Sequence, residues 1–155
     1  HNINKIGSIK AAYDMIPENW GPEPSVNWRP FQAELLEIIS KKCEDNRSIM
    51  WYHDEPGLCG KSVFSTHMLK WNPSVFVSTH CEAYHIATTL QNRELNGIPV
   101  STVIINLCRT FDVTDKKLYE GLENIKDGLI TSKKYNGKTI TFDSPHVIVF
   151  PIVSQ

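Results

Sequence analysis

Four residues near the middle of the chain, Gly57, Gly60, Lys61 and Ser62, have the types and spacing of a phosphate-binding loop. In such a loop, glycines let the backbone curl so that successive N–H groups point at an anion, and the positive end of the following helix faces the same anion. The lysine reaches the β and γ phosphates of a nucleotide, and the serine hydroxyl binds Mg²⁺. The spacing therefore predicts a site for nucleotide phosphates and their magnesium ion.

The loop departs from the usual pattern, which has another glycine at the position of Glu55. A bare G-x-x-G-K-S also occurs by chance, so the flanking residues matter. Residues 48–52 form an apolar run typical of a buried strand, and residues 63–69 have helical spacing. This context favours a phosphate loop over an ordinary turn. The residues expected to contact the phosphates are Gly57, Leu58, Cys59, Gly60, Lys61, Ser62 and Val63.

Length and composition limit the class of protein. The chain has 155 residues, of which 41% are hydrophobic and 21% charged, as expected for one globular domain. Its net charge of −1 means that any contact with nucleic acid must come from a local basic patch. Four scattered cysteines without a C-x-x-C pair indicate free thiols in a reducing compartment. Without a membrane-length apolar run or a signal peptide, we expect an intracellular protein with no membrane partner.

The remaining pattern predicts an α/β fold, a three-layer P-loop NTPase with a mainly parallel sheet. We expect an N-terminal helix at 8–15 and a proline-rich linker up to residue 27, followed by one domain over 28–155 that is truncated at its C-terminus. A chain that starts with His1 is expected to be a fragment of a longer protein. Helices are predicted from Pro30, at 82–95 and at 114–126, and strands at 75–79, 100–107 and 146–150. Residues 129–142 predict a hairpin with a two-residue turn at Asn136-Gly137.

Taken together, these segments resemble the superfamily 3 helicase domain of replication-initiator (Rep) proteins from small circular single-stranded DNA viruses and their satellites. The resemblance runs from about Trp28 to the C-terminus. It rests on the order and spacing of Trp28-Arg29-Pro30-Phe31-Gln32, residues 47–54 with the phosphate loop, residues 103–109, residues 119–128, Lys133-Lys134-Tyr135 and residues 144–150.

The resemblance implies a motor that binds ATP and Mg²⁺ between the subunits of a ring, usually a hexamer, and moves single-stranded DNA, or RNA, through a central channel. It also implies a location in the host-cell nucleus. The expected nucleic-acid contacts are Lys133, Lys134, Tyr135 and Lys138, because lysines bind phosphates and an aromatic ring can stack on a base. The residues alone equally allow lysines that only solubilise an exposed hairpin. The resemblance favours DNA contact.

Two positions break the family pattern where catalysis would need them. Asn106 stands where the second ATPase motif has an acidic residue that holds Mg²⁺ and helps activate water. We expect Asn106 and Ser62 at the metal position, and Lys61 and Asn106 at the catalytic positions. The third motif ends in Pro151 and Ile152 instead of a polar sensor. These changes predict weak or absent ATP hydrolysis.

Three functions stay open on the sequence alone. The chain is the ATP-hydrolysing helicase domain of a working Rep protein, an inactive nucleotide- or DNA-binding relic of the same fold, or an unrelated P-loop NTPase or kinase. A kinase lid needs arginines, and only Arg93 and Arg109 follow the loop. A zinc site at His80, Cys81 and His85 is not expected, because a structural site needs four ligands.

Overall fold

Helices and strands alternate along the part of the chain that the computed structural model describes, residues 22–45, 47–52, 60–110, 115–132 and 137–152. The predicted helix at 8–15 and loop residues 53–59 lie outside these ranges. The elements are α2 (Pro30–Ser40), β1 (Ile49–Trp51), α3 (Gly60–Trp71), β2 (Val75–Ser78), α4 (Ala83–Leu95), β3 (Thr102–Thr110), α5 (Lys116–Asp127), β4 (Leu129–Ser132), β5 (Lys138–Thr141) and β6 (His146–Ile152).

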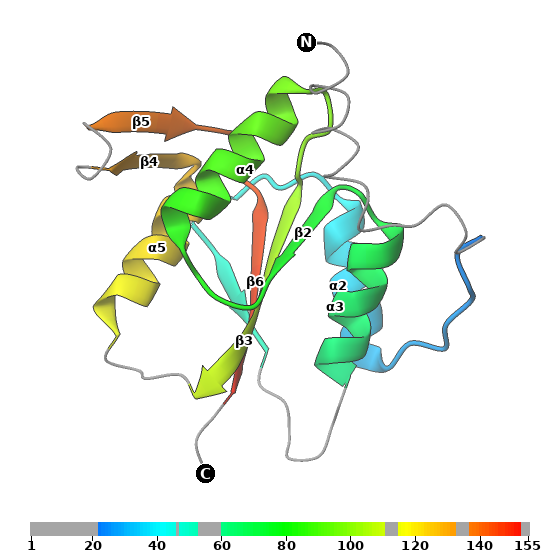
Figure 1. Ribbon diagram of the computed structural model, residues 1–155. Helices are drawn as coiled ribbons and strands as arrows, with labels where there is room; N and C mark the ends of the chain where they lie inside the picture. Colours follow the sequence, from blue (N-terminus) through cyan, green and yellow to red (C-terminus); the bar gives the residue numbers. More distant parts are fainter. Residues whose placement is uncertain (1–21, 46, 53–59, 111–114, 133–136, 153–155) are drawn as a thin grey trace.

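The central sheet has the strand order β1-β6-β3-β2, and all its pairings are parallel (Figure 1). The last strand of the chain, β6, therefore lies between β1 and β3. Residues 147–150 of β6 are fully buried, as expected for a strand covered on both faces. The predicted α/β fold with a mainly parallel sheet is confirmed.

Side chains alternate along β6 between two cores on opposite faces of the sheet. Val147 and Val149 pack with α4, α5 and the β4–β5 hairpin. Ile148 and Phe150 pack with α2 and α3. Figure 1 shows the same layers, with α2 and α3 on one side of the strands and α4 and α5 on the other. Successive side chains of β6 thus point to opposite faces of the sheet, so helices pack on both faces. The result is three layers, with the sheet between two pairs of helices.

The hairpin β4–β5 is a separate antiparallel sheet with a register that differs from the predicted one. It pairs Ser132 with Lys138 and Ile130 with Ile140, whereas a two-residue turn at Asn136-Gly137 would place residue 135 opposite residue 138. The described strands therefore do not have the register that such a turn would give, and Asn136 itself lies outside the described residues. In the predicted register Ile130 would face Asp143 instead of Ile140. Both isoleucines are buried in the core under α4 and α5, so hydrophobic burial fixes the register against the turn propensity.

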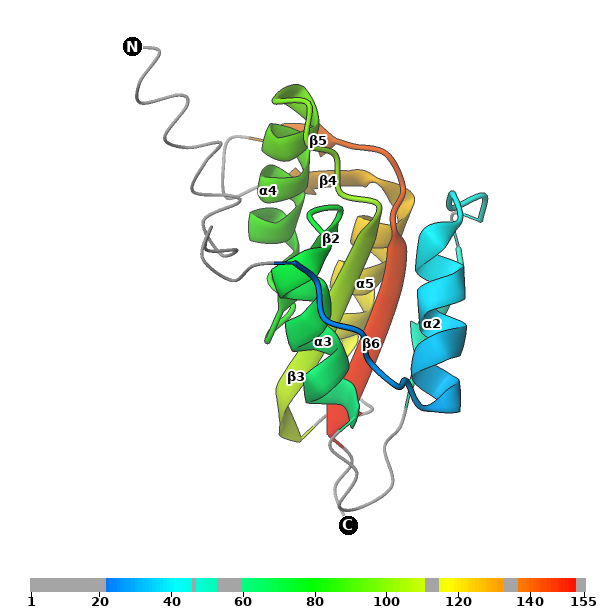
Figure 2. The same cartoon turned by 90° about the vertical axis from the view of Figure 1, so that its right-hand side faces the viewer.

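The segment before α2 lies across α3 (Figure 2). Trp28 makes edge-on ring contacts with Phe64 at 5.6 Å and with His67 at 4.9 Å between ring centroids. His67 Nε2 lies 2.7 Å from a carboxylate oxygen of Glu23. Trp28 therefore packs this segment onto α3. No helix in the described ranges is long and apolar enough to cross a membrane.

Gly128 connects α5 to the hairpin and has a conformation that glycine favours. It caps α5 with φ at 75°, and a Cβ there would collide with the carbonyl oxygen of Phe142. We expect Gly128→Ala to destabilise the fold by at least about 2 kcal/mol, from the left-handed φ and the displaced backbone. Urea unfolding measures this change.

Gly97→Ala is the matched control, because Gly97 also has a positive φ, 78°, but nothing lies within 4 Å of a Cβ there. Gly97→Ala should lower the free energy of unfolding by only about 1–2 kcal/mol, which is the effect of the left-handed backbone conformation alone. Equal losses in the two variants would contradict the role given to the Phe142 contact.

Candidate functional site

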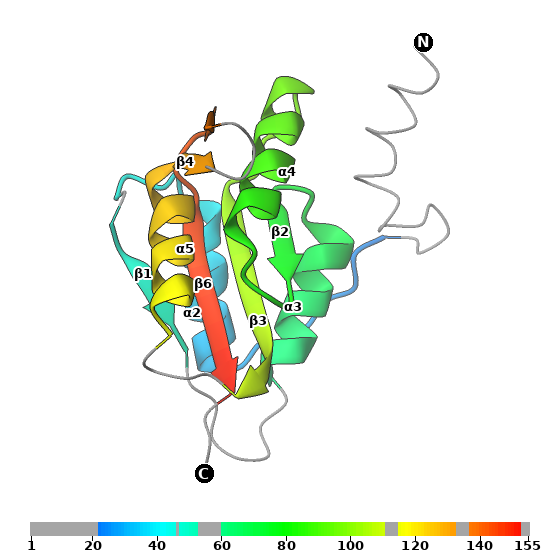
Figure 3. The same ribbon diagram turned by 60° about the vertical axis from the view of Figure 1, so that its left-hand side comes forward.

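The carboxyl ends of the parallel strands form one edge of the sheet, where the chain leaves for opposite faces (Figure 3). After β1 the chain continues to α3 on one face, and after β3 it continues to α5 on the other. Strand β6 ends between them. In open α/β sheets, ligands bind outside the carboxyl ends of the strands where the connections diverge in this way.

Lys61 lies at this edge, in the first turn of α3. Its Nζ donates a hydrogen bond to the carbonyl oxygen of Pro151 at 2.9 Å, near the end of β6. The side chain therefore reaches from α3 to the central strand, between the ends of β1 and β3. The structure thus places the Lys61 amine at the carboxyl edge of the sheet.

The acceptor of this hydrogen bond lies where the pairing of β6 becomes irregular. The β3–β6 pairing is regular up to Asn106 and Phe150, then shifts and resumes at Thr110 and Ile152. Proline has no N–H to donate to a neighbouring strand, and an inner strand rarely contains one. Pro151 therefore lies in the irregular end of the ladder, and its carbonyl accepts the hydrogen bond from Lys61.

The start of α3 has the electrostatic character of an anion site. Its N-terminal N–H groups form the positive end of a 12-residue helix, and its first turn contains no acidic residue. Ser62 and Val63 are exposed there. Tyr52, at the start of the loop, has a pKa raised by burial and by the charge of Glu34, so its hydroxyl adds no negative charge near neutral pH. Gly57, Leu58 and Cys59 lie outside the described residues.

Gly60 fixes the start of α3 against α2. It is buried, and a Cβ there would lie 2.9 Å from a ring carbon of Phe31 and 3.2 Å from Nε2 of Gln32. Real Cβ contacts are not found at 2.9 Å. The glycine at this loop position therefore also allows two helices to approach closely.

Gln32 joins the starts of the two helices by hydrogen bonds. Its Nε2 donates to the carbonyl oxygen of Gly60 at 2.8 Å, and its Oε1 accepts from the backbone N–H of Arg29 at 2.9 Å. The side chain is 4% exposed. The sequence alone assigned Gln32 no structural role. The pattern that could have indicated one is a polar residue in the first turn of an amphipathic helix, just after its proline, where a side chain can bond the free N–H groups of the helix start.

Asn106 lies on the strand next to the one that Lys61 contacts. It pairs in register with Phe150, one residue before Pro151. Ile104 packs toward α3 and Ile105 toward α4 and α5, so alternation places the Asn106 side chain on the α3 face. Lys61 and Asn106 thus approach the end of β6 from a helix and from a neighbouring strand.

Strand β3 continues to Thr110 beyond its predicted end at 107.

Lys138, one of the predicted nucleic-acid residues, is not brought close to Lys61. Lys138 is exposed at the start of β5, and Figure 1 places the β4–β5 hairpin at the end of the molecule opposite to the carboxyl edge of the sheet. Lys133, Lys134 and Tyr135 lie outside the described residues. The described part of the hairpin is therefore separate from the candidate nucleotide site.

The histidines after β2 form no described metal centre. His80 lies 3.8 Å from a carboxylate oxygen of Glu82, and His85 is exposed on α4. Within the ranges that the structure describes, no group of three or more His, Cys, Asp or Glu side chains could hold a metal ion.

Comparison with known proteins finds distant relatives among viral replication proteins. The chain is 28% identical over 122 residues to the Master replication protein of Faba bean necrotic yellows virus (isolate Syrian SV292-88). The identity and aligned length are the same for the Master replication protein of Milk vetch dwarf virus (isolate N). The match covers 79% of this chain but only 38% of each viral protein. No protein-family model and no solved structure matches the chain. The chain is therefore similar, at a distance, to Rep-type viral proteins.

Proposed function

We propose that this chain is an ATP-binding domain of a replication protein of the Rep type, and that it acts on single-stranded nucleic acid within an oligomeric ring. The observation that supports this most is the position of Lys61, whose Nζ lies at the carboxyl edge of the sheet, 2.9 Å from the Pro151 carbonyl. The similarity to Master replication proteins supports the role in replication.

In this proposal Lys61 exchanges the Pro151 carbonyl for phosphate oxygens. The Pro151 carbonyl is a neutral acceptor, whereas the phosphate oxygens carry negative charge, opposite to that of the lysine. The N–H groups at the start of α3 and of the preceding loop bind the same phosphates. The exchange therefore needs only a rotation of the lysine side chain.

Magnesium fits this site only as a partner of the nucleotide. Ser62 offers an exposed hydroxyl and Asn106 an amide oxygen, and both are neutral. Mg²⁺ keeps several waters and is commonly held by one or two protein groups together with substrate phosphates. These residues would therefore hold the ion after ATP has bound, and the ion would offset phosphate charge.

The same geometry favours binding with little turnover as the second candidate function. An amide at position 106 cannot act as a base, and the buried Pro151 provides no polar side chain at the end of β6. Losing one well-placed electrostatic group commonly costs on the order of 10²–10³ in rate. We expect ATP affinity to be retained and hydrolysis to be slow.

Lys61→Ala tests the proposed phosphate contact. We expect it to weaken ATP binding at least about 10-fold, because one charge-assisted bond to phosphate contributes about 1.5–3 kcal/mol. Isothermal titration with Mg-ATP measures the change. Lys42→Ala is the control, since Lys42 is an exposed lysine far from this edge. Equal affinity in the Lys61→Ala and unsubstituted chains would exclude the proposed site.

Asn106→Asp tests whether the missing carboxylate limits turnover. We expect phosphate release to rise by at least about 10-fold, because the aspartate restores a charge beside the metal position. Asn92→Asp, on the exposed surface of α4, adds the same charge far from the site and should leave the rate of phosphate release unchanged. Binding of ATP without any rise in turnover would show that a further group is missing. A rapid turnover by the unsubstituted chain would contradict the slow-hydrolysis proposal.

Gln32→Met tests whether the link between α2 and α3 positions the site. The variant keeps side-chain volume but leaves the Arg29 N–H and Gly60 carbonyl without this partner. We expect a loss of about 1–3 kcal/mol in stability to urea, together with weaker ATP binding below the unfolding transition. Gln91→Met, which removes one surface hydrogen bond to Thr141, is the control. Unchanged ATP affinity in folded Gln32→Met would reduce Gln32 to a structural role.

A further inference from the structure

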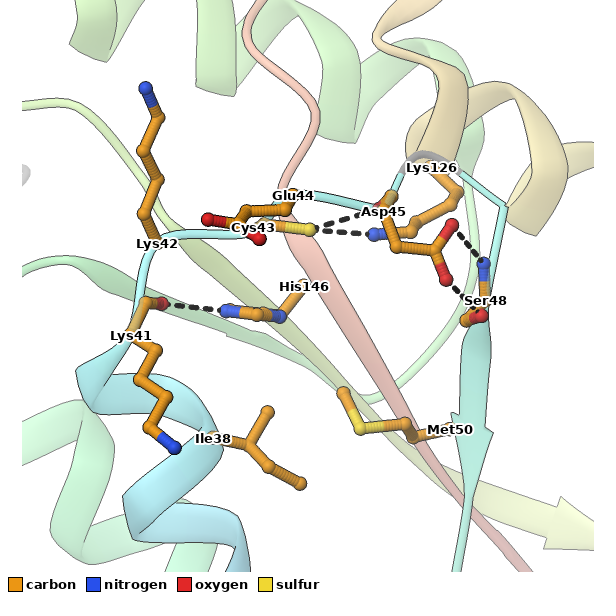
Figure 4. Close-up of a pocket in the computed structure, with 10 residues that line it drawn as sticks. All are labelled: Ile38, Lys41, Lys42, Cys43, Glu44, Asp45, Ser48, Met50, Lys126 and His146. Carbon is orange, nitrogen blue, oxygen red and sulfur yellow. Dashed lines mark hydrogen bonds between the residues drawn. The ribbon is translucent and has the colours of Figure 1, made fainter.

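A cavity of about 460 Å³ lies at the amino ends of the strands, opposite to the candidate nucleotide site. It is enclosed by the C-terminal part of α2, the loop that leads to β1, and the starts of β1 and β6 (Figure 4). The lining includes two residues with nucleophilic side chains, Cys43 on the loop and Lys126 on the last turn of α5.

Cys43 and Lys126 are in direct contact. Lys126 Nζ lies 2.9 Å from Cys43 Sγ and donates a second hydrogen bond to the carbonyl oxygen of Pro145 at 2.8 Å. Cys43 Sγ in turn donates to the carbonyl oxygen of Asp45 at 3.0 Å. Lys126 is 2% exposed, so its nitrogen is held beside the sulfur by packing as well as by hydrogen bonds.

No carboxylate in the described part of the chain lies within ion-pair distance of Lys126. The nearby Asp45 carboxylate accepts hydrogen bonds from the Ser48 hydroxyl and the Arg47 N–H. These two bonds lower the Asp45 pKa most, and the charge of Lys126 adds a smaller lowering. Burial of an amine without an ion-pair partner costs free energy. A reaction that makes this nitrogen neutral removes that cost.

A simple anion site is less consistent with this cavity. The C-terminal ends of α2 and α5 both lie at it, and helix C-termini carry partial negative charge that favours cations. The lysines of the cavity are therefore already balanced in part by the two helix ends. The Cys43–Lys126 contact is what remains to be explained.

We propose that peroxide oxidation joins Cys43 and Lys126 through a sulfenamide bond. Hydrogen peroxide first oxidises the Cys43 thiol to sulfenic acid and is reduced to water. The Lys126 ammonium loses one proton to water in the cavity, and the lone pair of the resulting amine attacks the sulfur, so that an S–N bond forms and the S–O bond breaks. The hydroxyl leaves as water with one proton from the nitrogen. Sulfur supplies the two electrons that peroxide accepts, and no other reactant is needed.

The contact with an amine and the opening onto a cavity favour Cys43 over Cys81. Cys43 is half-buried and opens onto the cavity, so a small oxidant reaches it. Burial, with a smaller effect of the Asp115 charge, raises the pKa of the Cys81 thiol to about 11. Cys81 therefore stays a protonated and poorly reactive thiol at neutral pH.

The bond would close a long stretch of chain, because 83 positions separate the two residues. It would tie the loop after α2 to the end of α5, across the amino edge of the sheet. Closing a loop of this length removes entropy from the unfolded chain, so we expect Tm to rise by roughly 5 °C or more. Reduction by a thiol should reverse the change.

The test uses the full chain with Cys59, Cys81 and Cys108 replaced by serine, so that no disulfide within the chain can form. After treatment with hydrogen peroxide, we expect a chain lighter by two hydrogens, with the peptides of Cys43 and Lys126 joined in a tryptic map. Trypsin should no longer cleave after Lys126, and dithiothreitol should restore the original mass and map. A joined pair elsewhere, or oxygen added without joined peptides, would overturn the proposal.

Lys126→Arg is the matched variant, because it keeps the positive charge and supplies a much weaker nucleophile. In this variant we expect the sulfenic acid to persist, to be trapped by dimedone, and to leave Tm unchanged. Loss of two hydrogens in Lys126→Arg would assign the link to another nitrogen and overturn the proposal. If the arginine prevents folding, as seen by circular dichroism, the peptide map of the lysine-containing chain still decides.

Discussion

The hydrogen bond from Lys61 to the Pro151 carbonyl is the contact on which the candidate site depends. It joins the first turn of α3 to the central strand of the sheet, at the edge where the chain diverges to both faces. The acceptor lies in the last part of β6, where the regular pairing with β3 has ended. In the proposed function, a lysine held at this edge exchanges the carbonyl for the phosphate oxygens of a bound nucleotide.

The fold supports this contact from several directions. Strand β6 is buried between two cores, so the Pro151 carbonyl has a fixed position. Gln32 and Gly60 fix the start of α3 against α2, and the α2–β1 loop contacts the end of α5 through Cys43 and Lys126. The candidate nucleotide edge therefore lies at the carboxyl end of the central sheet, whereas the hairpin and the Cys43 cavity both lie toward its amino end.

Much of the fold was predictable because each element has a clear local signal. The β-branched run around Val103, the apolar strand after Pro145 and the glycine after α5 predicted elements that the structure contains. The hairpin register was predicted incorrectly, since turn propensity at Asn136-Gly137 is weaker than the burial of Ile130 and Ile140. The Gln32 link and the Pro151 carbonyl were not predictable, because both depend on contacts between distant parts of the chain. The loop residues Gly57, Leu58 and Cys59 stay a prediction, as do the hairpin contacts of Lys133, Lys134 and Tyr135.

The most direct test is a crystal structure of this chain with Mg²⁺ and a non-hydrolysable ATP analogue. The central claim predicts that Lys61 Nζ leaves the Pro151 carbonyl and lies within hydrogen-bond distance of the β and γ phosphates, with the phosphates at the N-terminus of α3. An analogue bound elsewhere, or one bound while Lys61 still contacts Pro151 and no phosphate, would contradict it.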